Sequence, residues 1–96
     1  MARQPRSLHG QVVAVTGGAR GIGLATARAL ARQGMKVAIG DLDAALAQRE
    51  AESIGGAIGL PLDVTDRDSF SRFLDEVERA HGPLDVLVNN AGVMHM

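Results

Sequence analysis

Four short apolar runs alternate with three segments of helical character, and this alternation constrains the fold more than any other feature of the sequence. The runs are built mainly from Val, Ile, Leu and Ala, at residues 11–17, 36–41, 57–64 and 84–90. The helix-like segments lie between them, at 21–34, 43–56 and 65–82. Uniformly apolar strands that alternate with helices are typical of a parallel sheet covered on both faces. The order βαβαβαβ therefore predicts an α/β fold with a doubly wound parallel sheet.

Local signals predict where these elements begin and end. Gly34 should stop the first helix, and Asp43 should cap the second. Thr65 and Asp68 have the spacing of a capping box for the third helix. Pro61 has no N–H for a sheet ladder, which favours an edge position or an irregularity for the third strand.

Apolar residues at helical spacing support the first helix and form one apolar stripe on the third. In the first helix the apolar residues near helical spacing are Ile22, Ala25, Ala29 and Leu30. In the third helix they are Phe70, Phe73, Leu74 and Val77.

Composition limits the classes of function. A formal net charge of −1 gives no basic face for nucleic acid, so we expect no nucleic-acid partner. The chain has no cysteine, which excludes disulfides and thiolate chemistry and fits a reducing, cytoplasmic location. The three histidines show no metal-ligand spacing, so we expect no metal site. No apolar run is long enough to span a bilayer, and we expect no membrane partner.

The first residues differ from the rest of the chain. Residues 1–7 carry Arg3 and Arg6 with no apolar stretch after them, unlike a signal peptide. We expect 1–7 to be a disordered lead-in and 8–96 to form one unit, without a linker or repeat.

The first strand runs directly into a glycine-rich turn, "TGGARGIG", from Thr16 to Gly23. Gly17 permits a sharp turn, Gly21 permits close approach of a phosphate, and Gly23 permits tight packing of helix on strand. The N–H groups and dipole of the following helix favour an anion there. A plain glycine-rich βα turn would have the same pattern, so the loop alone leaves both interpretations open.

An acidic residue, Asp41, ends the second strand 18 residues after Gly23. This spacing suits a carboxylate that accepts hydrogen bonds from an adenosine ribose, although Asp is also common as a helix cap. A carboxylate ~4 Å from the 2′-phosphate of NADP would repel it by about 4 kcal/mol at an effective dielectric of ~20. Arg20 could attract that phosphate, but an exposed Arg typically contributes only ~0–1 kcal/mol. We therefore predict a preference for NAD.

Four motifs in this order resemble the N-terminal part of the short-chain dehydrogenase/reductase family. They are "TGGARGIG", Asp41, "DVTD" at 63–66 and "NNAG" at 89–92. The resemblance covers about residues 8–96 and implies an incomplete Rossmann-like sheet of strand order 3-2-1-4. It also implies further cofactor contacts: the backbone N–H of Ile22 at the pyrophosphate, Asp63 and Val64 at the adenine, and Asn90, Ala91 and Gly92 beside the ribose. Asn89 is expected to brace neighbouring strands.

The resemblance implies an oxidoreductase that transfers hydride between NAD(P) and an alcohol or carbonyl. The family's catalytic Ser, Tyr and Lys follow the NNAG turn, whereas this sequence has no Tyr and its one lysine is Lys36. We therefore assign no catalytic residue and expect these 96 residues alone to be inactive. The alternative is a catalytically inactive nucleotide-binding module or a truncated remnant. Full-length relatives are expected to form homo-oligomers.

Overall fold

The structure is a computed structural model that describes residues 7–90. Its elements follow the expected order, and their bounds are β1 Val12–Thr16, α1 Gly21–Arg32, β2 Lys36–Asp41, α2 Ala44–Ser53, β3 Ile58–Pro61, α3 Arg67–His81 and β4 Val86–Asn89. The predicted lead-in lies outside the described residues except for Ser7. Ala91 and Gly92 of the NNAG turn lie outside them as well.

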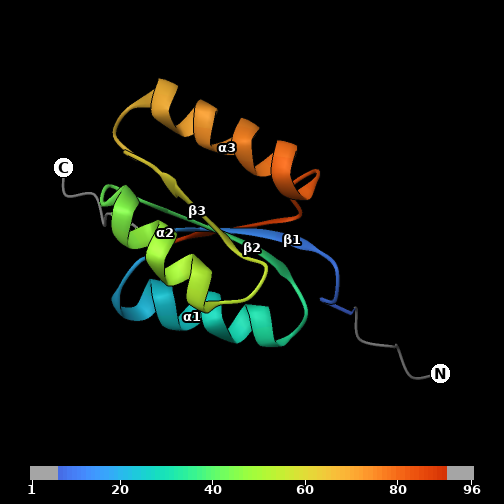
Figure 1. Ribbon diagram of the computed structural model, residues 1–96. Coiled ribbons are helices and arrows are strands. Elements are labelled where there is room, and N and C mark those ends of the chain that lie inside the picture. The colour runs from blue at the N-terminus through green and yellow to red at the C-terminus, as the bar shows by residue number, and fades with distance from the viewer. Residues whose placement is uncertain (1–6, 91–96) are drawn as a thin grey trace.

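All four strands are parallel and form one sheet in the order β3-β2-β1-β4, which confirms the predicted topology. The sheet lies between two helical layers, with α1 and α2 on one face and α3 on the other (Figure 1). Strand order reverses between β1 and β4, and a crevice at such a reversal is where open α/β sheets bind ligands. Thr16 and Asn89 are register partners at the carboxyl end of this strand pair.

Each face of the sheet has its own apolar core. The core under α1 and α2 contains Val13, Val15, Val37 and Ile39 from the central strands. The core under α3 is centred on Phe73 and Val77, with Phe70 and Leu74 packed against it. The predicted stripe of α3 is therefore confirmed, and so is the edge position of β3 that Pro61 indicated.

The apolar residues near helical spacing in α1 do not form its buried face, except for Leu30, which packs against the core. Ile22 is 77% exposed and Ala25 and Ala29 are also exposed. The helix instead buries Gly23 and Ala27 and packs Leu24, Leu30 and Ala31 against the core. Alanine lies on both the exposed and the buried side of this helix, so spacing alone does not determine its face.

The predicted capping box of α3 was wrong. The N-cap is Asp66, whose carboxylate accepts hydrogen bonds from the N–H groups of Asp68 and Ser69. Thr65 lies outside the helix, and its hydroxyl donates to Asp63 instead. The predicted cap of α2 is confirmed, because Asp43 accepts from the N–H of Leu46. The predicted stop of α1 is confirmed by Gly34, which follows the C-cap with φ of 85°.

None of the helices within residues 7–90 combines the length and apolar character needed to cross a bilayer.

Candidate dinucleotide-binding site

The glycine loop leaves β1 by a sharp turn that is anchored to β2. Gly17 has φ of 64°, a region that favours glycine. The N–H groups of Gly17 and Gly18 both donate to the carbonyl oxygen of Gly40, at 2.8 and 3.2 Å. These bonds place the start of the loop over the carboxyl end of β2, beside Asp41.

The amino end of α1 is open at the end of this loop. Its N-cap residue is Arg20, whose side chain makes no capping hydrogen bond, and its first turn contains no acidic residue. By contrast, α2 and α3 are capped by the carboxylates of Asp43 and Asp66. Gly21 has φ of 60°, and a Cβ added there would meet no atom within 4 Å. The N–H groups of this turn are therefore accessible to an anion from outside.

The first turn of α1 packs directly on the loop at Gly23. A Cβ at this position would clash with the carbonyl oxygen of Gly17 and lie 2.6 Å from Nδ2 of Asn90. Only a residue without a side chain permits this distance between helix and strand end. The close packing expected of Gly23 is thus present, and it brings the helix end, β1 and β4 together at one point.

Asp41 is fixed against the glycine loop by its own carboxylate. Oδ2 accepts from the N–H of Ala19 at 3.3 Å, and Oδ1 accepts from the N–H of Asp43 at 3.0 Å. A carboxylate offers about four acceptor positions, so two are left for further donors. Sequence reasoning placed Asp41 near a ribose but missed its bond to Ala19, since nothing in the sequence links two positions 22 residues apart.

Arg20 and Asp43 form an exposed ion pair between the loop and α2. The distance from Nη2 of Arg20 to Oδ2 of Asp43 is 3.3 Å, and the two side chains are 67% and 49% exposed. Asp43 uses its other oxygen, Oδ1, to cap α2. The sequence identified the cap but gave no signal for the pair.

Asp63 follows β3 and is held by Thr65. Its Oδ1 accepts from the hydroxyl of Thr65 at 2.6 Å and from the N–H of Thr65 at 3.0 Å. These two bonds, the hydroxyl first, hold the pKa of the Asp63 carboxyl below its ordinary value of 3.8. The group is therefore ionised at neutral pH and acts only as an acceptor.

The carboxyl end of β4 is tied to that of β1. The buried hydroxyl of Thr16 donates to Oδ1 of Asn89 at 3.1 Å and accepts from the N–H of Asn90 at 2.9 Å. The side-chain amide of Asn90 donates to the carbonyl oxygen of Gly17 at 3.3 Å. Asn89 thus braces the two strands as expected. Thr16 is buried and acts by positioning its neighbours.

Ile22 and Val64, the other two predicted cofactor contacts within the described residues, differ in the exposure of their side chains. The side chain of Ile22 is 77% exposed at the start of α1. The side chain of Val64 packs against the core under α3.

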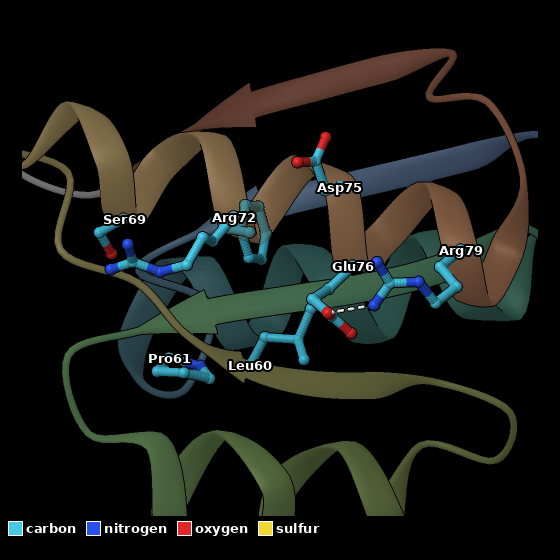
Figure 2. Close-up of a pocket in the computed structure, with 8 residues that line it drawn as sticks. Leu60, Pro61, Ser69, Arg72, Asp75, Glu76 and Arg79 are labelled. Carbon is cyan, nitrogen blue, oxygen red and sulfur yellow. Dashed lines mark hydrogen bonds and ion pairs between the residues drawn. The ribbon is translucent and has the colours of Figure 1, made fainter.

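A cavity of about 320 Å³ lies elsewhere, between β3 and α3. Figure 2 shows Leu60 and Pro61 on the strand side, and Ser69, Arg72, Asp75, Glu76 and Arg79 on the helix side. Arg79 pairs with Glu76 within it. None of the predicted site residues lines this cavity. Across residues 7–90, no group of three or more His, Asp or Glu side chains is placed to share a metal ion.

Comparison with known proteins decides the family. The model of the family described as short chain dehydrogenase matches residues 11–96. The chain belongs to the short-chain dehydrogenase family. This confirms the resemblance carried by "TGGARGIG", Asp41, "DVTD" and "NNAG".

Several curated short-chain dehydrogenases are similar to the chain over most of its length. 2-(S)-Hydroxypropyl-CoM dehydrogenase 3 of Xanthobacter autotrophicus is 47% identical over 90 residues, which cover 90% of this chain and 35% of the relative. Galactitol 2-dehydrogenase of Agrobacterium fabrum is 43% identical, with 93% and 35% covered. Sorbitol dehydrogenase of Cereibacter sphaeroides is 42% identical, with the same coverage. The chain spans about a third of the length of these relatives.

Proposed function

We propose that this chain binds the adenosine and pyrophosphate parts of NAD. It would serve as the cofactor-binding part of an oxidoreductase that transfers hydride between NAD and an alcohol or carbonyl. Membership of the short-chain dehydrogenase family supports this class of reaction. The relatives' names state different substrates, so no substrate is assigned to this chain.

The observation that carries the proposal is the hydrogen bond from Ala19 N–H to the Asp41 carboxylate. This bond sets an acceptor for ribose hydroxyls beside the uncapped end of α1, where a pyrophosphate is favoured. The dinucleotide-binding fingerprint combines these two features, a helix amino end for the pyrophosphate and an acidic residue for the ribose.

The other proposed contacts surround this pair. Gly17, Gly21, Ile22 and Gly23 supply the close backbone of the loop, and Thr16 positions it. Asp63 would accept from the adenine amino group through Oδ2. Val64 would contribute its backbone N–H, since its side chain packs against the α3 core. Asn90, with Ala91 and Gly92 outside the described residues, would border the ribose side.

NAD is proposed over NADP because Asp41 occupies the ribose side of the site. The repulsion of a 2′-phosphate worked above, about 4 kcal/mol at ~4 Å, exceeds what exposed Arg20 would return. Asp41→Ala should therefore relax the preference, which titration of the parent and variant with NAD and NADP measures. Equal discrimination by the two proteins would refute this role of Asp41.

A second candidate is binding without turnover by these 96 residues. The favouring observation is that the sequence has no Tyr, while Lys36 begins β2 and Asp41 ends it. Lys36 is therefore at the opposite end of the sheet from the glycine loop. Lys36 therefore does not occupy the position of the family's catalytic lysine.

Calorimetry and a turnover assay together test both candidates. Titration of the 96-residue chain with NAD should give saturable binding, with the Asp41→Ala and Gly23→Ala variants as comparisons. Incubation with NAD and a panel of secondary alcohols should produce no NADH. Absence of NAD binding would overturn both candidates, and NADH production would overturn the second. A cytoplasmic location and homo-oligomers of full-length relatives remain predictions.

A further inference from the structure

A closed circuit of polar contacts joins the glycine loop to the turn between β2 and α2. Ala19 N–H donates to Asp41, and Asp41 accepts from the N–H of Asp43. Asp43 then pairs with Arg20, which follows Ala19 in the chain. The circuit places two carboxylates and one guanidinium at the corner where the proposed ribose site lies.

The one cation of this circuit, Arg20, is already paired with Asp43. The guanidinium of Arg20 lies 3.3 Å from Oδ2 of Asp43, so a ligand phosphate would have to compete with a carboxylate for it. The net charge of the three side chains is negative even with Arg20 included. Arg20 in this arrangement is therefore not a free phosphate-binding residue.

We propose that Asp43 is a second specificity-determining residue, which disfavours NADP by engaging Arg20. The inference rests on the proposed function, since it concerns the ribose end of the same dinucleotide site. Discrimination then depends on two carboxylates acting differently: Asp41 repels the 2′-phosphate, and Asp43 holds the cation that would attract it.

Capping α2 is not the only role of the Asp43 carboxylate. Its two oxygens serve different partners, Oδ1 the N–H of Leu46 and Oδ2 the guanidinium of Arg20. Asp43→Asn separates the two roles. The amide oxygen can still cap α2, whereas the amide nitrogen cannot accept from Arg20 and the negative charge is gone.

The experiment measures NAD and NADP affinities of the 96-residue chain by calorimetry, in an Asp41→Ala background where the first carboxylate is absent. Adding Asp43→Asn should raise NADP affinity relative to NAD affinity by about two- to fivefold, the range for one exposed ion pair. Adding Arg20→Gln as well should abolish this gain. Raising the salt concentration should reduce it, because the groups are exposed.

A matched control breaks a similar pair away from this corner. Arg28 on α1 and Glu50 on α2 also bridge the two helices, at 3.0 Å. Glu50→Gln should leave the ratio of NADP to NAD affinity unchanged. Far-ultraviolet circular dichroism checks that each variant keeps the helix content of the parent.

The outcomes separate this inference from the proposed function. No gain with Asp43→Asn overturns the inference, as does an equal gain when Arg20 is Gln, because Asp43 would then act without Arg20. NAD binding by the parent with NADP undetectable in every variant also overturns it. A parent that binds neither dinucleotide overturns the proposed function itself.

Discussion

Gly23→Ala tests whether the contact between α1 and the end of β1 sets the geometry of the site. The added Cβ would clash with the Gly17 carbonyl oxygen and lie 2.6 Å from Nδ2 of Asn90. The first of these is backbone, which cannot move aside by changing rotamer. Overpacking of this kind costs about 1–3 kcal/mol. Alanine returns up to about 1 kcal/mol of helix propensity. Because the clash is with backbone, we take the upper part of the overpacking range, about 2–3 kcal/mol, so the net destabilisation should be about 1–2 kcal/mol.

Urea unfolding followed by circular dichroism measures this effect, because the chain has no Trp. At a slope of about 1 kcal/mol per molar urea, the midpoint should fall by ~1–2 M. NAD should bind about tenfold more weakly, the equivalent of one lost hydrogen bond to the displaced helix end. Gly55→Ala is the control, since its Cβ meets no atom within 4 Å and its φ lies outside the left-handed region. An unchanged midpoint and NAD affinity in Gly23→Ala would refute the reasoning.

Two further predictions concern the turn between β3 and α3. Asp66→Ala removes the acceptor for two N–H groups of α3 and should cost about 1 kcal/mol of unfolding free energy, whereas Asp66→Asn should cost less. Equal losses in both variants would contradict the capping role. The folded pKa of Asp63 lies below its unfolded value, so its contribution is present above pH 3.8 and is lost as the pH falls further. Thr65→Val removes the larger cause of the shift, so its urea midpoint should fall less steeply than that of the parent as the pH is lowered from about 4 to about 2. Parallel pH profiles would count against this account.

The order of the elements and the topology of the sheet could be predicted because their causes are local or periodic. The strands were predicted from apolar runs, the edge strand from Pro61, and the buried face of α3 from the spacing of Phe73 and Val77. Each of these patterns is local and does not depend on distant parts of the chain. The face of α1 could not be predicted in the same way. Alanine lies on both the exposed and the buried side of this helix, and the close packing at Gly23 lies on the buried side.

The cap of α3 shows a different reason for a missed prediction. Thr65 and Asp66 are both good caps, and their sequence gives no basis for choosing between them. In the fold, Asp63 takes the hydroxyl and N–H of Thr65, which leaves Asp66 to begin the helix. The choice depends on how the turn orients Thr65 toward Asp63, which propensity does not describe.

Part of the candidate site could be predicted from local sequence patterns, and part could not. Its glycine loop and Asp41 follow from spacing within one βαβ unit. The circuit through Ala19, Arg20 and Asp43 depends on how α2 is placed against the loop. It therefore becomes visible only in three dimensions.

The bonds between β4 and β1 have a consequence for local opening. Among the described residues β4 pairs only with β1, so β4, like β3 at the other edge, can separate with the loss of one ladder. When β4 separates, the hydroxyl of Thr16 loses its bond from the N–H of Asn90, and the carbonyl oxygen of Gly17 loses its bond from the side-chain amide of Asn90. Amide hydrogens of β4 and of Asn90 should therefore exchange with deuterium as one cooperative unit, whereas those of Gly17 and Gly18, which bond to Gly40 of β2, should not open with them. A dinucleotide that holds Asn90 against the loop should slow the exchange of this unit.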